Sequence, residues 1–247
     1  MITGGPHWPY PKIIAHRGGG TLAPENTIAA LRCGLEYGFH AVEFDVMLSK
    51  DGVPVLMHDP LFGRTVRGDG GVAASLAAEL QQMDAGSWFS ERFAGERIPT
   101  YVQVIEFCQQ HRIWMNVEIK PVPGFEEITG RVVAEVTKQM QAGDDVLFSS
   151  FSFDALMQAK LVAPEIKRGF LTDQIESDWQ QRLEQLDAIA LHTNHKHLTP
   201  EIAQQIKAAG YGLFCYTVNT PERAREILDW GVDAFCTDRI DLIAADF

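Results

Sequence analysis

The sequence lacks the features that would place it among membrane, secreted or multidomain proteins. It has no hydrophobic run near the ~20 residues that a membrane-spanning helix needs. Its first ten residues, MITGGPHWPY, have neither the basic cluster nor the apolar block of a secretory signal. Internal repeats, low-complexity tracts and linker-like segments are also missing, so we expect residues 1–247 to form a single domain.

Cysteine and positive charge are both scarce. The four cysteines show no C-x-x-C spacing and lie in apolar segments, which indicates reduced thiols in a cytoplasmic protein. The 33 Asp and Glu outnumber the 21 Lys and Arg, for a formal net charge of −12. Because affinity for nucleic acids depends on an excess of Lys and Arg, this balance argues against a nucleic-acid partner. A small anion could still bind at a local cationic site.

Short β-rich runs alternate with amphipathic helical stretches along nearly the whole chain. Several helical stretches end on glycine, as helix C-termini often do. The predicted strands are residues 13–17, 41–46, 114–120, 146–150, 168–171, 188–192, 212–218 and 234–238. Eight such βα units in a chain of 247 residues predict a (β/α)8 TIM barrel, with a doubly wound open sheet as the alternative.

One unit, from residue 47 to residue 113, is far longer than an ordinary βα connection. It contains GVPVLMHDP, which could form a strand or hairpin, then the Gly-rich GRTVRGDGGV and the aromatic GSWFSERF. We expect the helix of this unit near residues 102–111. The preceding part, at about residues 50–98, is predicted to be a small insertion after strand 2 that covers one end of the barrel.

Two predicted strands carry charged side chains at alternate positions. In AVEFDV, Glu43 and Asp45 share one face, and in MNVEIK, Glu118 and Lys120 do so. The opposite faces are apolar and must pack on the helices outside the barrel, so these charged side chains point inward. They lie near the C-terminal ends of their strands, where barrels carry active sites.

Three carboxylates in a confined interior are costly unless they are neutralised. In one interpretation, Lys120 and Arg17 pair with them in a structural charge cluster. In the interpretation that we favour, Glu43, Asp45 and Glu118 bind a divalent cation, because an all-oxygen set suits Mg²⁺ or Ca²⁺ better than zinc.

The first strand runs into His16 and Arg17 and then into three glycines, Gly18–Gly20. These glycines could let backbone N–H groups approach an anion, or could form a flexible connector. The PENT segment that follows is interpreted as structural, with Asn26 as the N-cap of the next helix.

The remaining histidines give weaker signals. His58 precedes Asp-Pro, and by itself such a histidine is more often a turn or capping residue than a catalyst. His192, His195 and His197 suggest a metal site by their spacing, but no carboxylate or cysteine is in register with them. We therefore interpret their segment as a solvated loop.

Six motifs occur in order along the chain: AHRGGG…PENT, EFDVMLSKDG, VLMHDP, NVEIKP, YTVN and GVDAFCTD. Together they resemble the glycerophosphodiester phosphodiesterase family, most closely its bacterial cytoplasmic members, from residue 13 to about residue 241. The resemblance implies a TIM barrel with a subdomain inserted after the second strand. It also implies hydrolysis of a small-molecule glycerophosphodiester to sn-glycerol 3-phosphate and an alcohol.

The resemblance also assigns roles to individual residues. It implies acid/base catalysis by His16 and His58, metal binding by Glu43, Asp45 and Glu118, and phosphate binding by Arg17 and Lys120. Tyr216 stands in YTVN where a common form of the motif has tryptophan, at the wall of the substrate pocket. One divalent cation is implied, with Mg²⁺ preferred and Ca²⁺ or Mn²⁺ as alternatives. The alcohol, the oligomeric state and the nucleophile, water or a neighbouring hydroxyl, stay open.

Three rival functions fit the sequence less well. A metal-dependent amidohydrolase would have H-x-H on the first strand, where this chain has His16-Arg17. A phosphatidylinositol-type phospholipase would need an apolar or basic membrane-facing surface, and the insertion offers only Trp88, Phe89 and Phe93. A non-catalytic phosphate-binding barrel would not need three carboxylates and two histidines.

Overall fold

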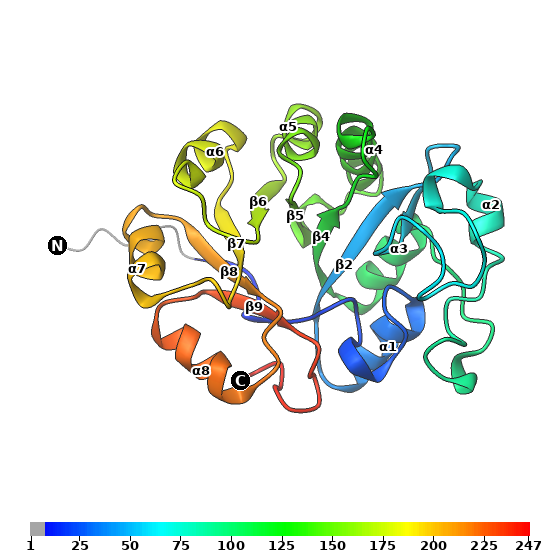
Figure 1. The fold of residues 1–247 in the computed structure, drawn as a ribbon, viewed down its shortest axis with the longest axis horizontal. Coiled ribbons are helices and arrows are strands. Elements are labelled where there is room, and N and C mark those ends of the chain that lie inside the picture. Colours follow the sequence, from blue (N-terminus) through cyan, green and yellow to red (C-terminus); the bar gives the residue numbers. More distant parts are fainter. Residues whose placement is uncertain (1–7) are drawn as a thin grey trace.

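Eight parallel strands close into a barrel in the computed structural model, which describes residues 8–247 (Figure 1). The strands follow the order β1-β9-β8-β7-β6-β5-β4-β2, and β1 pairs with β2 to close the barrel. The helices between the strands lie around the outside of the sheet (Figure 1). The predicted TIM barrel is therefore confirmed, and the open doubly wound sheet is wrong.

The observed strands match the predicted ones closely. The barrel strands are β1 (Ile13–Ala15), β2 (Ala41–Leu48), β4 (Trp114–Ile119), β5 (Val146–Ser150), β6 (Lys167–Thr172), β7 (Ala190–Asn194), β8 (Gly212–Tyr216) and β9 (Ala234–Thr237). The helices are α1 (Ile28–Glu36), α2 (Ala77–Leu80), α3 (Tyr101–His111), α4 (Glu126–Gln139), α5 (Phe153–Val162), α6 (Trp179–Leu186), α7 (Pro200–Ala208) and α8 (Pro221–Asp229).

The start of α1 corrects one expectation. Thr27, not Asn26, is the N-cap, because the Thr27 side chain accepts a hydrogen bond from the backbone N–H of Ala30. Asn26 precedes the cap in a left-handed conformation with φ of 57°. Asparagine tolerates this conformation better than most residues. Its buried side chain does not cap the helix and instead forms a hydrogen bond with Asp45.

One end of the barrel is packed with apolar side chains. Trp8 clusters with residues from the beginnings of the strands, among them Ala41, Trp114 and Ala234. The Trp8 ring also lies against Gly212, where an added Cβ would sit 3.1 Å from it. Because this end is filled, the end at which the strands terminate is left to carry a site.

The chain between β2 and α3 forms the insertion. It begins with β3 (Pro54–Leu56), which runs antiparallel to the end of β2. Short helical turns follow, and the apolar side chains of this segment have a cluster of their own that includes Val55, Val72 and Leu80. We propose that it is a subdomain of a single catalytic domain rather than a second domain.

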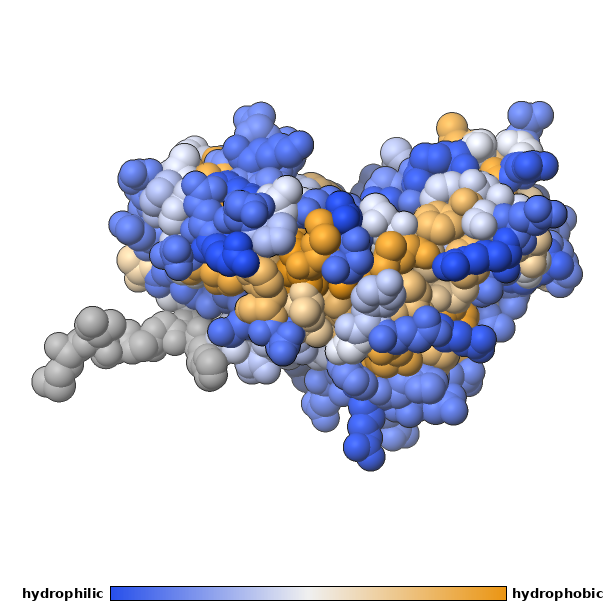
Figure 2. Space-filling model, turned by 90° about the horizontal axis from the view of Figure 1, so that it is seen from below, coloured by the Kyte–Doolittle hydropathy of each residue, from blue (hydrophilic) through white to orange (hydrophobic). Residues whose placement is uncertain are grey.

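One face of the protein carries both hydrophilic and hydrophobic side chains (Figure 2). Figure 2 shows hydrophilic side chains around the edges of one face, hydrophobic ones in a band across its middle, and a hollow at its upper edge. Among residues 8–247, no helix combines the length and the apolar character needed to cross a membrane. The expectation that the chain has no secretory signal depends on its first ten residues. Of these, residues 1–7 lie outside the part of the chain that the structure describes.

Candidate active site

A cavity of about 180 Å³ opens among the ends of the barrel strands. It gathers residues that lie far apart in the sequence. Its lining includes His16, Arg17, Glu43, His58, Asn116, Glu118, Lys120, Ser149, Phe151, Leu171, Phe214 and Tyr216. Every candidate site residue from the sequence is in this lining except Asp45, which lies behind it and is 1% exposed.

The three candidate metal ligands meet at this cavity. One oxygen from each of Glu43, Asp45 and Glu118 lies within 4.8 Å of the other two. The strand register produces this meeting, because Asp45 of β2 is the lateral neighbour of Glu118 of β4. Glu43 lies two residues earlier on the same face of β2.

The pKa values of these carboxyl groups separate into two kinds. Burial, together with the charge of Asp45, raises the pKa of Glu43 to about 7 and that of Glu118 to about 8. Burial also tends to raise the pKa of Asp45. The positive charges of Lys120 and Arg17 have a larger effect in the opposite direction and hold the Asp45 pKa well below its usual range. The cationic side chains of the protein therefore compensate the charge of Asp45 more fully than the charges of Glu43 and Glu118.

This donor set fits a bound divalent cation. Two oxygens on opposite sides of one ion would be about 4.2 Å apart for Mg²⁺ and about 5 Å apart for Ca²⁺. The observed limit of 4.8 Å lies within the span of Ca²⁺, and Mg²⁺ would draw the three oxygens closer together. A cation would also add positive charge beside Glu43 and Glu118, where the net effect of the surroundings raises the pKa. The structural charge cluster and a cation site are thus not exclusive alternatives, because Asp45 pairs with Lys120 and also has an oxygen within 4.8 Å of oxygens of Glu43 and Glu118.

Arg17 and Lys120 flank the carboxylates. The Lys120 Nζ lies 3.0 Å from an Asp45 oxygen and 3.5 Å from a Glu118 oxygen. The Arg17 Nε lies 3.5 Å from the other Asp45 oxygen. Arg17 also has a left-handed backbone, with φ of 50°, and its N–H donates to Glu43. The turn after β1 is held against β2 by these contacts.

Each catalytic candidate histidine is oriented by an aspartate. The Nδ1 atom of His16 is 2.6 Å from Asp238, and the Nδ1 atom of His58 is 2.6 Å from Asp59. These bonds leave Nε2 of each ring for proton transfer, and the Nε2 of His16 lies 3.6 Å from Glu43. Although burial opposes it, the carboxylates of Asp238 and Glu43 raise the His16 pKa. Burial, aided by Arg17 and other positive charges, lowers the His58 pKa.

His58 reaches the cavity through the hairpin of β2 and β3. The backbone N–H of Met57 donates to the carbonyl of Asp45, which fixes the end of β3 beside the carboxylate cluster. Residue pattern alone does not place this histidine at the cavity, because strand periodicity does not tell whether a short segment folds back along its neighbour.

A chain of charged residues joins the insertion to the barrel, and sequence reasoning missed it. Arg64 donates to Asp59 through Nε, at 2.6 Å, and to both oxygens of Glu25 through its two terminal nitrogens, at 2.7 Å each. Glu25 in turn accepts from Arg17 at 2.8 Å. A signal is present in the sequence, since Glu25 belongs to PENT and Asp59 to MHDP, but PENT by itself indicates a mainly structural role.

The glycines of the turn after β1 are required by close packing. A Cβ on Gly18 would lie 2.9 Å from the Ala30 side chain, and one on Gly20 would lie 2.1 Å from the Asp238 carbonyl oxygen. The glycines therefore let the turn pack tightly against α1 and against the chain after β9. This packing argues against a flexible connector, and the approach of backbone N–H groups to an anion stays a prediction.

The interpretation of the other histidines as one solvated loop is wrong for His192. His192 lies in β7, is fully buried and stacks on Phe214, with ring centroids 4.4 Å apart. Burial lowers its pKa to about 3. His195 is half-buried and His197 is exposed, as the loop interpretation predicts.

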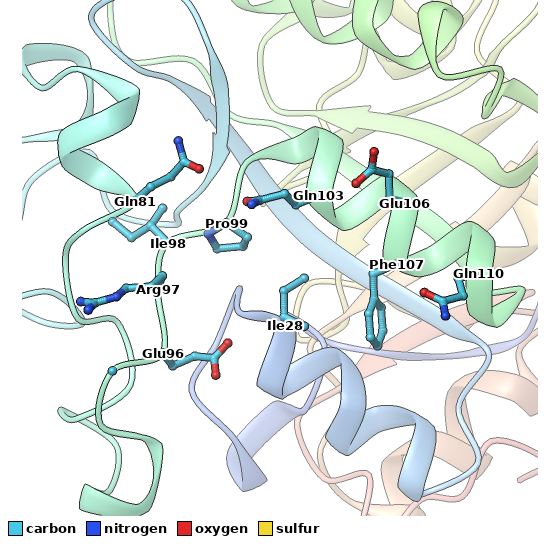
Figure 3. A pocket seen from close by; sticks show the side chains of 11 residues that line it. Ile28, Gln81, Glu96, Arg97, Ile98, Pro99, Gln103, Glu106, Phe107 and Gln110 are labelled. Atoms are coloured by element: carbon cyan, nitrogen blue, oxygen red, sulfur yellow. The ribbon is translucent and has the colours of Figure 1, made fainter.

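A larger cavity, of about 460 Å³, lies outside the barrel (Figure 3). Its walls come from α1, α3 and the insertion, with Ile28, Gln103 and Arg97 among the side chains shown. It contains none of the histidines or of the three candidate metal ligands. The smaller cavity at the strand ends is therefore the candidate active site.

Known proteins are similar to this chain over nearly its whole length. The model of the "Glycerophosphoryl diester phosphodiesterase family" matches residues 16–242. A glycerophosphodiester phosphodiesterase of Caldanaerobacter subterraneus subsp. tengcongensis is 36% identical over 92% of this chain and 93% of the relative.

Solved structures are similar over the same length. A phosphodiesterase of Oleispira antarctica, in complex with the product sn-glycerol-3-phosphate, has 43% sequence identity and a TM-score of 0.89, over 92% of this chain and 93% of that one. A glycerophosphodiester phosphodiesterase of Agrobacterium tumefaciens str. C58 has 30% identity and a TM-score of 0.82, over 96% of this chain and all of that one.

Proposed function

The chain belongs to the glycerophosphoryl diester phosphodiesterase family, and on that basis we propose that it hydrolyses glycerophosphodiesters to sn-glycerol 3-phosphate and an alcohol. The observation that carries this proposal is the set of side chains around one small cavity. Three carboxylates, the cationic side chains of Arg17 and Lys120, and two aspartate-bound histidines meet there. The similar Oleispira antarctica protein holds sn-glycerol-3-phosphate, the product that this reaction would release.

The reaction needs help at three points. The diester carries a negative charge that repels a nucleophile, the nucleophile must lose a proton, and the departing alkoxide must gain one. A divalent cation held by Glu43, Asp45 and Glu118 would withdraw charge from the phosphate oxygens. We assign that cation as Mg²⁺, with Ca²⁺ or Mn²⁺ as the alternatives.

Arg17 and Lys120 are the proposed phosphate ligands. Arg17 can offer two parallel N–H donors to phosphate oxygens, whereas Lys120 supplies a compact positive charge. Their contacts with Asp45 and Glu25 hold both side chains beside the cavity before substrate arrives. Fixed positive groups of this kind stabilise the charge that accumulates on the phosphate in the transition state.

His16 and His58 are the proposed acid/base pair. One ring accepts the proton of the nucleophile through Nε2, and the other gives a proton to the alkoxide as its bond to phosphorus breaks. The hydrogen bonds from Nδ1 to Asp238 and Asp59 support this role, because they fix the ring orientation and direct proton exchange to Nε2. Tyr216, which donates to the Thr172 carbonyl, is proposed to form part of the substrate-pocket wall.

A cytoplasmic location is also part of the proposal. It is supported by the four cysteines, all of which are buried and unpaired with one another.

The test is release of sn-glycerol 3-phosphate from glycerophosphocholine by the purified protein of residues 1–247. We expect turnover that EDTA abolishes and that an added divalent cation restores, with Mg²⁺, Ca²⁺ and Mn²⁺ compared side by side. A protein with no turnover under any of these metals would contradict the proposed activity, and turnover that persists in EDTA would contradict the metal dependence.

A further inference from the structure

Two buried polar atoms in the lining of the active-site cavity have no hydrogen-bond partner among the described residues. They are Oδ1 of Asn116 and Oγ of Ser149. Asn116 is 2% exposed and Ser149 is 1% exposed. A buried polar group without a partner costs free energy, so such atoms at the wall of a cavity indicate a ligand that pairs with them.

The barrel places these two side chains next to two candidate metal ligands. Asn116 of β4 is the lateral neighbour of Glu43 of β2, and Ser149 of β5 is the lateral neighbour of Glu118 of β4. Asn116 also shares the inward face of β4 with Glu118, two residues later. A ligand that reaches the carboxylate cluster from the interior of the barrel therefore meets both polar atoms.

The chemistry of the two groups selects a hydroxyl-bearing ligand. An amide presents a carbonyl acceptor and an N–H donor, and a serine hydroxyl both donates and accepts. A phosphate oxygen can only accept, so it cannot satisfy the Asn116 carbonyl. A hydroxyl group pairs with either end of an amide and with another hydroxyl, and glycerol offers two of them next to its phosphate.

We propose that Asn116 and Ser149 bind the hydroxyl groups of the glycerol half of the substrate. This inference rests on the proposed function and assigns an orientation to the diester. A cavity of about 180 Å³ is smaller than the roughly 300–1,000 Å³ that hold drug-sized ligands, so it suits the compact glycerol phosphate half.

The alcohol half then lies toward the mouth of the barrel. Phe151 is 49% exposed there, and with Glu118 and Lys120 it lines both the cavity and an adjoining groove of about 490 Å³.

The experiment compares binding of two phosphate monoesters that differ only in hydroxyl groups. sn-Glycerol 3-phosphate and n-propyl phosphate are titrated by calorimetry into the Mg²⁺-loaded protein, its Asn116→Leu and Ser149→Ala variants, and the double variant. Thr193→Val is the matched control, because the Thr193 Oγ1 is also buried without a partner among residues 8–247 but does not line the cavity. Thermal melts and a Mg²⁺ titration are recorded for every variant.

We expect the wild-type protein to bind sn-glycerol 3-phosphate about 10- to 100-fold more tightly than propyl phosphate, since the monoester without hydroxyls leaves both buried groups unpaired. Each single variant should lose much of this preference, and the double variant nearly all of it, mainly through weaker binding of the glycerol ester. Thr193→Val should keep the preference. Ser149→Ala removes a single atom and keeps the test valid if Asn116→Leu does not fold.

Two outcomes would overturn the inference. One is an unchanged ratio of affinities in the variants, which would show a structural role. The other is a loss of Mg²⁺ affinity with the ratio preserved, which would make the two residues metal ligands. The proposed function is tested separately in the same preparation by hydrolysis of glycerophosphoethanolamine. Turnover without a preference for sn-glycerol 3-phosphate over propyl phosphate refutes the inference alone. The same preference without turnover refutes the proposed function alone.

Discussion

The side chain of Asn26 forms two hydrogen bonds with Asp45. Its Nδ2 donates to the Asp45 carboxylate at 2.9 Å, and its Oδ1 accepts from the Asp45 backbone N–H at 3.2 Å. The amide therefore fixes both the backbone of β2 and the carboxylate at this residue. The second oxygen of Asp45 accepts a hydrogen bond from Lys120. Partners that orient a metal ligand in this way typically matter almost as much as the ligand itself.

Asn26→Asp should weaken binding of the divalent cation. The substitution keeps the shape and tolerates the left-handed backbone, but it replaces the donor with an oxygen that repels the Asp45 carboxylate. We expect the affinity for Mg²⁺ or Mn²⁺, measured by calorimetry, to fall roughly 10- to 100-fold. Asn26→Gly is the control, because it removes the amide without adding charge and should have a smaller effect. Equal affinities in Asn26→Asp and wild type would show that Asn26 does not orient the site.

His16→Ala and His58→Ala should each remove most turnover while cation binding survives. General acid/base catalysis contributes about 10²- to 10⁴-fold in rate, so kcat for release of sn-glycerol 3-phosphate should fall by that order. Neither histidine is a proposed metal ligand, and the three carboxylates keep their positions on β2 and β4. The measurement is kcat together with a metal titration of each variant. A near wild-type kcat in either one would make its acid/base assignment wrong.

Arg64→Lys should lower kcat without changing metal affinity. The guanidinium binds Asp59 and both oxygens of Glu25 at once, so it orients His58 through the first and Arg17 through the second. Lysine keeps the charge but cannot span both carboxylates. We expect a loss of about 10-fold, by analogy with other outer-sphere partners.

A double-mutant cycle separates positioning by Arg64 from simple loss of packing. If Arg64 acts through Glu25, then Arg64→Lys in a Glu25→Gln background should cost clearly less activity than it does in the wild type. Fully additive effects on kcat would contradict a coupled role. The melting temperatures of the single variants show whether any loss of activity merely reflects unfolding.

Asp84→Asn should destabilise the insertion in a pH-dependent manner. The Asp84 carboxylate accepts from Ser87, Gly95 and Gly86, and these donors hold its pKa well below the usual range. A lowered folded-state pKa contributes stability above the unfolded pKa of about 3.9 and loses it as the pH falls below that value. At pH 7 we expect the variant to melt about 2–4 °C below the wild type, and this gap to shrink below pH 4.

The control for this prediction is Asp69→Asn, at an exposed position of the same insertion. Its melting temperature should follow that of the wild type throughout. The difference in melting temperature between Asp84→Asn and wild type could instead be constant from pH 7 to pH 2.5. That result would show that the charge of the Asp84 carboxylate does not stabilise the loop.

The periodicity of the sequence was enough to predict the barrel and the inward carboxylates. Alternation in β2 and β4 leaves only one face for the helices, and this local rule fixes where Glu43, Asp45 and Glu118 point. The motifs placed His16 and Arg17 at the same rim. These conclusions needed only the pattern within single strands and the parallel arrangement that eight βα units impose.

Contacts between distant segments were decided by the tertiary structure. The fold-back of β3 brings His58 to Asp45, Asn26 leaves its expected capping role to hold Asp45, and Arg64 connects Glu25 with Asp59. The burial of His192 likewise depends on Phe214 from a neighbouring strand. Strand and helix periodicity is a property of neighbours in the chain, whereas hydrogen bonds between loops depend on three-dimensional distances that only the closed barrel sets.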